Sequence, residues 1–203
     1  GCYLMNSIPV ESPSVNEIPK EQLQATVPLE STSFSIWPLH FRNHGLNNKG
    51  VQLFQQGKYQ DALHKFQHVV DHDPGNTDGY YNLAATYHRL AMESNNRQML
   101  TQSEHLYLRC IDMAPNHVDA HRGLAVLLAQ TSRKQQSYEL LEAWVKRSPQ
   151  SAEAQVELAR LHDEDGEIDQ AELHLQNALS IDTSLPRAWT ALGHLREREG
   201  DLP

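Results

Sequence analysis

Three histidines form the first arrangement in this sequence that could do chemistry. His64, His68 and His72 are spaced four residues apart, so they would share one face of a helix, and imidazoles at that spacing can ligate a metal ion. The buried face of the same segment is defined by Ala62 and Phe66, which directs the three histidines towards solvent. No Asp, Glu or Cys completes a motif such as HExxH, so we expect a solvated polar face and no metal cofactor.

A second arrangement imitates part of a calcium-binding loop. In the segment HDEDGEIDQAE, several carboxylates and Gly166 fall at spacings that suit an EF-hand. The first ligand position would be Leu161, which offers no oxygen. The sequence also lacks a nucleophile elbow, a phosphate-binding glycine loop and a Ser/His/Asp signature. We therefore predict a protein that is not an enzyme and that needs no cofactor.

The composition excludes further classes of function. The chain has 203 residues and a formal net charge of −9, which argues against nucleic-acid binding, because that activity needs a concentrated basic face. No run of 18 apolar residues is present, so a membrane-spanning helix is not expected. The two cysteines, Cys2 and Cys110, cannot make a disulfide framework or a thiolate zinc site. This composition is typical of a soluble globular protein.

Proline placement divides the chain into two parts. Half of the ten prolines fall within residues 1–42, together with many Ser, Thr, Glu and Gln residues. This composition does not form a core of its own and predicts an extended N-terminal arm. In residues 43–203, prolines recur at intervals of 34 to 41 residues, each just after a helical pattern: Pro74, Pro115, Pro149 and Pro186. Because proline cannot continue a helix, this spacing predicts repeated helical units.

Small residues repeat with the same period. They fall 34, 41, 34 and 34 residues apart, at Gly50, Ala84, Ala125, Ala159 and Gly193. Twelve residues after the small residue comes a second small side chain, and four further on a large apolar one, as in Ala62 and Phe66. Ser103 and Tyr107 take these roles in the second unit once seven extra residues are allowed. The small residues let two helices approach closely, and each unit must stack on its neighbours to bury its apolar face.

With these features the region 43–203 resembles an array of tetratricopeptide repeats (TPRs). The segments GYYNLAATYHRL, GKYQDALHKFQHVVDHDPGN and RAWTALGHLREREGDLP sit close to the family pattern. The resemblance implies an all-α, right-handed α-solenoid of four helix hairpins and a further half repeat, behind the N-terminal arm. The repeats would cover residues 43–76, 77–117, 118–151 and 152–185, with the half repeat at 186–203.

The second unit contains seven extra residues, within LAMESNNRQMLTQ. Seven residues are about two helical turns, so each helix of that hairpin can gain one turn while its apolar phase is kept. The turn would then centre on Ser94, Asn95 and Asn96, which are good turn formers. The extension is either a tolerated protrusion or a contact for a partner.

The family resemblance also implies a concave groove lined by the first helix of each unit. A peptide or a helix of a partner would lie in it, held by Arg and Tyr anchors among small and apolar residues. The peptide-binding residues would be Asn47, Phe54, Tyr81, His88, Arg89, Arg122, Gln130 and Arg160. The carboxylate clamp of TPR co-chaperones is not expected, because Val51, Asp119 and Gly123 stand where Asn, Lys or Arg is required.

Charge is unevenly distributed between the units. Residues 152–185 contain nine carboxylates and one arginine, a net charge of −8, whereas residues 118–151 carry a net charge of +2. An acidic unit beside a basic one favours polar partners in a fixed direction, because complementary fields set orientation and association rate. The alternative is a solvated surface with no target.

Both ends of the sequence bear on partners and location. Gly1-Cys2 resembles the end of a bacterial lipobox, which would make Cys2 a lipid attachment site on the periplasmic side of the envelope; alternatively Cys2 is incidental and the protein is cytoplasmic. The arm contains SFSIWPLHF, which we expect to cap the first hairpin or to lie in a groove. Trp189, Leu192 and Leu195 would leave the last helix partly uncovered, so self-association through the arm or this C-terminal edge is a further expectation, as is continuation of the native chain.

These patterns predict a non-catalytic scaffold that binds a protein or peptide, in one interpretation during bacterial envelope or pilus assembly. Two alternatives remain open: a regulatory TPR portion of a larger enzyme, and a self-association module. A membrane would be involved only through a lipid anchor.

Overall fold

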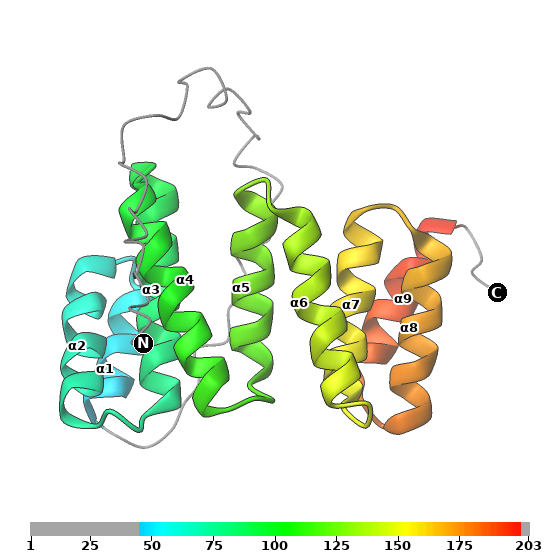
Figure 1. Cartoon of the computed structure of the whole chain (residues 1–203), viewed down its shortest axis with the longest axis horizontal. Helices are drawn as coiled ribbons and strands as arrows, with labels where there is room; N and C mark the ends of the chain where they lie inside the picture. Colours follow the sequence, from blue (N-terminus) through cyan, green and yellow to red (C-terminus); the bar gives the residue numbers. More distant parts are fainter. Residues whose placement is uncertain (1–44, 200–203) are drawn as a thin grey trace, which may run out of the picture. The chain divides into compact units, whose positions relative to one another are not determined.

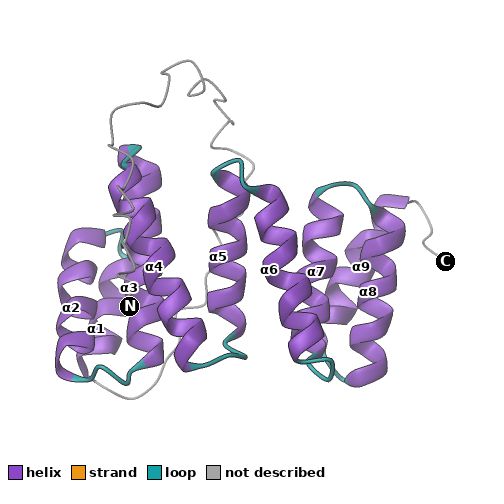
Figure 2. Cartoon of the chain, in the orientation of Figure 1, coloured by secondary structure: helices purple, strands orange, loops and turns teal. Residues whose placement is uncertain are grey.

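The computed structural model describes residues 45–199, which form helices and short connections without a strand (Figure 2). The predicted arm, the segment SFSIWPLHF and Cys2 lie outside this part of the chain. In chain order the helices are α1 (Gly45–Gln55), α2 (Tyr59–His72), α3 (Thr77–Ser94), α4 (Arg97–Met113), α5 (Val118–Gln130), α6 (Lys134–Arg147), α7 (Ala152–Glu164), α8 (Ile168–Ile181) and α9 (Pro186–Glu199).

These helices pack in an order that follows the sequence. Each helix contacts the next one along the chain, from α1 with α2 to α8 with α9 (Figure 1). Each odd-numbered helix also contacts the next odd-numbered helix, whereas within residues 45–199 no two even-numbered helices contact each other. The odd helices therefore form a continuous inner row, and the even helices lie on the outer side. The predicted all-α solenoid of four helix hairpins and a half repeat is confirmed.

Small residues bring the two helices of a hairpin together, as the sequence predicts. The Oγ of Ser103 donates a hydrogen bond to the backbone carbonyl of Ala84 at 2.8 Å, and the Oγ of Ser137 donates one to that of Ala125 at 3.0 Å. All four residues are buried, and so is Tyr107, one turn after Ser103. The roles predicted for Ser103 and Tyr107 after the seven extra residues are confirmed.

The longer second hairpin takes its extra residues as helix. Helices α3 and α4 contain 18 and 17 residues, against 13 or 14 in each helix of the two hairpins that follow. Between them Asn95 adopts the left-handed conformation with φ 50°, and the side chain of Asn96 accepts a hydrogen bond from the N–H of Met99. An asparagine tolerates this conformation better than most side chains. The predicted turn at residues 94–96 is confirmed.

The apolar core consists of three clusters along the array. One spans α1 to α5, a second joins α5, α6 and α7, and the third joins α7, α8 and α9. Each cluster contains residues from at least two neighbouring hairpins, so stacking buries the apolar faces that a single hairpin would expose. Cys110 belongs to the first cluster as a buried thiol.

Candidate functional site

The residues predicted to line a groove all lie on the inner row of helices. Asn47 and Phe54 are on α1, Tyr81, His88 and Arg89 on α3, Arg122 and Gln130 on α5, and Arg160 on α7. Their burial divides them into two groups, because three are interior residues and five keep part of their surface exposed.

Three of the eight residues are buried and offer no surface to a partner. Asn47 and Tyr81 are 1% exposed and His88 is 0% exposed. The side-chain oxygen of Asn47 accepts a hydrogen bond from the amide of Asn82 at 2.9 Å, and the Tyr81 ring packs near that of Tyr107. The expectation that these three side chains face a bound peptide is therefore corrected: they join adjacent helices of the array.

His88 connects α3 to α5 from within the core. Its Nε2 lies 2.9 Å from the Oε1 of Gln130, which is the donor–acceptor distance of a good hydrogen bond. Burial lowers the pKa of His88 to about 4, although the bond to Gln130 acts in the opposite direction. The folded array thus holds His88 in its neutral form at physiological pH. Gln130 itself remains partly exposed.

Acidification is expected to destabilise the array between pH 6.5 and 4. Over this interval an unfolded chain binds a proton on His88 that the folded state does not, so stability falls as pH falls, by about 3 kcal/mol in all from this residue. Urea denaturation as a function of pH measures the effect. The free energy of unfolding is expected to change less steeply with pH in His88→Gln than in the wild type. The control is His105→Gln, at an exposed site on α4. Equal slopes in the two variants would contradict the prediction.

Phe54 and Arg89 both contact Tyr59 of the first hairpin. The ring of Phe54 packs edge-on against Tyr59, with ring centroids 5.0 Å apart. The guanidinium of Arg89 lies 5.4 Å from the centroid of the same Tyr59 ring and donates a hydrogen bond to Glu93. A cation over an aromatic face at this distance is attracted by the ring quadrupole. The two predicted residues thus share one aromatic partner, and both are partly exposed.

Arg122 and Arg160 meet at a buried carboxylate that the sequence reasoning did not identify. Glu157 on α7 is 0% exposed. Its Oε1 accepts a hydrogen bond from the Nε of Arg122 at 2.9 Å, and its Oε2 accepts one from the Nε of Arg160 at 3.2 Å. Arg187 on α9 pairs with the same carboxylate, and Arg122 also pairs with Asp119 at 3.3 Å. One carboxylate therefore joins guanidinium groups from α5, α7 and α9.

The three arginines keep Glu157 ionised. Burial alone would raise the pKa of this carboxyl, but the hydrogen bonds and charge of Arg122, with the charges of Arg160 and Arg187, outweigh burial and lower the pKa to about 2. A buried carboxylate is tolerated only when it is paired in this way. Glu157 and the three arginines, which together form the Glu157 cluster, therefore all carry charge over the whole physiological pH range.

The repeat register explains why Glu157 occupies this place. Asn47 and Asn82 are separated by 35 residues, and Arg122 and Glu157 are separated by the same number. The first pair joins α1 to α3 through two neutral amides. The second pair joins α5 to α7 through an ion pair. At the junction between them the equivalent residue is Gly123, where a Cβ would lie 2.6 Å from the Tyr107 ring. This register was the signal that could have identified Glu157.

Part of the acidic segment 152–185 is paired with its neighbours. Besides Glu157, three of its nine carboxylates pair with basic residues of α6 and α9: Asp165 with Lys134, Asp163 with Arg198, and Glu172 with Arg196. The basic residues that precede and follow the segment thus compensate part of its charge. Part of the uneven charge in the sequence therefore lies in contacts within the array, which neither sequence interpretation included.

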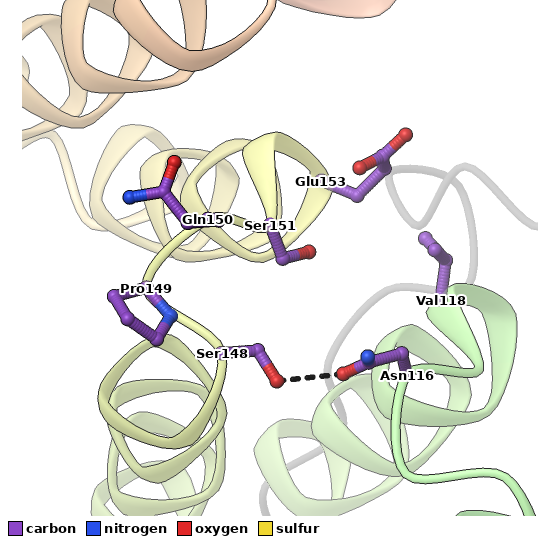
Figure 3. A pocket seen from close by; sticks show the side chains of 7 residues that line it. All are labelled: Asn116, Val118, Ser148, Pro149, Gln150, Ser151 and Glu153. Carbon is purple, nitrogen blue, oxygen red and sulfur yellow. Dashed lines mark hydrogen bonds between the residues drawn. The ribbon is translucent and has the colours of Figure 1, made fainter.

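An open pocket lies between the connections that precede and follow the third hairpin. It has a volume of about 570 Å³ and lies where the α4–α5 and α6–α7 connections approach each other (Figure 3). The Oγ of Ser148 donates a hydrogen bond to the Oδ1 of Asn116 at 2.7 Å across its floor, and the indole N–H of Trp144 donates one to the same oxygen. Val118 and Glu153, from the first turns of α5 and α7, also line the pocket (Figure 3).

Histidines form a polar contact between α7 and α8 in place of apolar packing. The His162 and His174 rings stack with centroids 5.2 Å apart, and the Nδ1 of His174 lies 2.8 Å from the Oε1 of Gln155. Among residues 45–199, no group of three or more His, Cys, Asp or Glu side chains is placed to hold a metal ion. His64, His68 and His72 lie on the outer helix α2, and His68 and His72 are exposed, as the sequence predicts.

Comparison with known families identifies the repeats. Residues 50–90 match a family described as TPR repeat, and residues 96–152 and 135–195 match families described as tetratricopeptide repeat. The chain is a tetratricopeptide repeat protein. The mouse (Mus musculus) PEX5-related protein is 26% identical to this chain over 116 residues, which are 57% of this chain and 18% of that protein. The chain therefore spans less than a fifth of the length of this curated relative.

A solved structure of a TPR protein shares the fold. TTC0263, a thermophilic TPR protein of Thermus thermophilus, superposes with a TM-score of 0.56 at 18% identity, over 70% of this chain and 77% of that one. MamA from Desulfovibrio magneticus RS-1 gives a TM-score of 0.47 at 20% identity, over 77% and 84% of the two chains. None of the described TPR helices is both long and apolar enough to cross a membrane.

Proposed function

We propose that this TPR protein is a non-catalytic scaffold that binds a peptide or a helix of a partner along its inner row of helices. Membership of the TPR family supports a role in protein interaction. The observation that carries the finer proposal is a line of partly exposed side chains presented by successive inner helices: Phe54, Arg89, Arg122, Gln130 and Arg160.

The chemistry of this line suits a polypeptide ligand. Aromatic and arginine side chains dominate the binding energy of protein interfaces, because they combine apolar area with several hydrogen-bond donors. Here they stand on helices that are joined by side-chain pairs such as His88–Gln130 and Arg122–Glu157. Side chains held in such pairs lose less conformational entropy when a partner binds.

Peptide selection with the full chain, followed by calorimetric titration, tests the proposal. For a selected peptide, Arg89→Ala is expected to weaken binding by about 1–3 kcal/mol, as is typical of an interface hot spot. Arg109→Ala is a matched control, because Arg109 also lies over a tyrosine ring, that of Tyr80 at 5.9 Å, but on the outer helix α4.

Two results would contradict the proposed function. One is that no peptide is selected above the background of the empty support. The other is that Arg109→Ala weakens binding of selected peptides as much as Arg89→Ala and Phe54→Ala do, because the ligand would then not lie on the inner row.

Self-association is the second candidate, since Trp189 on α9 is 55% exposed. Leu192 and Leu195, expected beside it at an uncovered edge, are instead buried against the third core cluster. Sedimentation velocity of the full chain over a wide concentration range distinguishes this candidate.

A role in envelope or pilus assembly, with a lipid on Cys2, remains a separate proposal that rests on Gly1-Cys2 alone.

A further inference from the structure

Arg187 differs from the other two arginines of the Glu157 cluster in how few of its donors are used. A guanidinium carries five N–H donors in a planar fork. Arg122 bonds to both Glu157 and Asp119, and Arg160 bonds to both Glu157 and Glu164. Arg187 bonds through one nitrogen, Nη2, to Glu157. Its Nε and Nη1 donate to no acceptor within residues 45–199.

The same side chain is also the most accessible of the three. The exposed fraction is 42% for Arg187, 26% for Arg160 and 17% for Arg122. Glu157 is shared among all three guanidinium groups, so Arg187 has no carboxylate of its own within the described residues. A positive charge with free donors and access from outside thus stands on the inner row, beside the partly exposed Arg160.

We propose that Arg187 binds a carboxylate side chain of an acidic segment of the partner. This inference rests on the proposed function of the inner row and specifies the chemistry of its ligand. A carboxylate fits the remaining edge of the Arg187 fork, where the second N–H of Nη2 and an N–H of the adjacent free nitrogen can bond in parallel to its two oxygens. A lysine or arginine of a partner would instead meet a guanidinium at close range.

Glu157 prepares the site rather than blocking it. Its buried carboxylate holds Arg187 by one nitrogen and so restricts where the guanidinium lies before a ligand arrives. Ordering a long side chain in advance removes part of the entropic cost of binding. The ligand carboxylate therefore adds to the existing contacts and does not need to displace Glu157.

Fluorescence anisotropy with the full chain at low salt tests the inference. The probe is a labelled peptide of alternating Glu and Ala, acetylated and amidated so that only side chains carry charge, and the comparison probe has Gln in place of Glu. The Glu probe is expected to bind about tenfold more tightly than the Gln probe, the size of effect typical of a charge-assisted bond. Arg187→Ala is expected to remove most of this difference.

Two variants control the experiment. Arg187→Lys keeps the charge but loses the fork, so its affinity for the Glu probe is expected to lie between those of the wild type and Arg187→Ala. Arg109→Ala makes the same change of charge on the outer helix α4 and is expected to leave the affinity unchanged. Circular dichroism establishes that each variant is folded.

The inference is overturned if the Glu probe binds no better than the Gln probe, or if Arg109→Ala loses as much affinity as Arg187→Ala. These results leave the proposed function untouched, because peptides selected without regard to charge would still lose affinity in Arg89→Ala. If, in contrast, the peptide selection finds no ligand, the proposed function itself fails, because the inner row would then bind no peptide of any charge.

Discussion

Replacing Glu157 with glutamine will lower the free energy of unfolding by about 3–5 kcal/mol, the range measured when one partner of a buried ion pair is removed. The carboxylate is fully buried, and guanidinium groups from α5, α7 and α9 depend on it. A glutamine has nearly the same shape but no charge, so the variant leaves three cations close together. Urea denaturation followed by circular dichroism measures the change.

The control for this variant is Glu164→Gln. Glu164 pairs with Arg160 but is 50% exposed, so its loss is expected to cost less than about 1 kcal/mol. The pKa of Glu157 adds a second check: it is about 2 in the folded protein against an ordinary value of 4.5, so this residue's contribution is present above pH 4.5 and is lost as the pH falls towards 2. A Glu157→Gln variant as stable as Glu164→Gln would show that the cluster does not hold the inner row together.

Trp144→Ala is expected to be destabilising by a similar amount, about 3–5 kcal/mol, because it removes a large side chain from a site with no exposure. The Trp144 ring stacks on His121, with centroids 4.0 Å apart and planes within 12°. Its indole N–H donates to the Oδ1 of Asn116 at 3.2 Å, which ties α6 to the α4–α5 connection. The alanine therefore leaves a cavity, and it removes the indole donor from the Oδ1 of Asn116 at the same place.

Thermal and urea denaturation of three tryptophan variants separates these contributions. Trp144→Phe keeps an aromatic ring but loses the N–H, and we expect an intermediate loss of stability. Trp189→Ala, at an exposed site, is expected to change stability by less than about 0.5 kcal/mol. If Trp144→Ala and Trp189→Ala were equally stable, packing in the second core cluster would not stabilise the contact between the third and fourth hairpins.

The sequence predicted the fold because the fold depends on residues that repeat. Ser103 could be identified across seven inserted residues, since a close helix contact accepts only a small side chain, and the structure has it bonded to the carbonyl of Ala84. The turn at Asn95 could be predicted for a related reason, because few side chains adopt the left-handed conformation that ends α3 there.

The candidate site was predicted less well, because a register gives the side on which a residue lies but not what covers it. Tyr81 and His88 lie on the inner helix α3, yet neighbouring helices bury both. Whether a position is covered depends on the side chains of the adjacent repeat. Where that repeat offers a glycine, as at Gly123, an aromatic ring from the preceding hairpin fills the space.

The same limit explains why Glu157 was missed. In the sequence it is one of nine carboxylates in a strongly acidic segment, and its partners Arg122 and Arg187 lie in different repeats. Only the contact between successive inner helices shows that this one carboxylate is buried and shared. Charge counted per repeat therefore suggested a partner, whereas part of it holds the repeats to each other.

The arrangement of the rows determines how the molecule can deform. Successive hairpins meet along the odd-numbered helices, while the even-numbered helices of residues 45–199 make no contact with one another. The inner row thus acts as a flexible spine, and a small change of angle at each junction moves the outer helices without breaking contacts between them. Curvature is consequently the softest degree of freedom of this array, so a bulky ligand can be admitted by small adjustments shared among several hairpins.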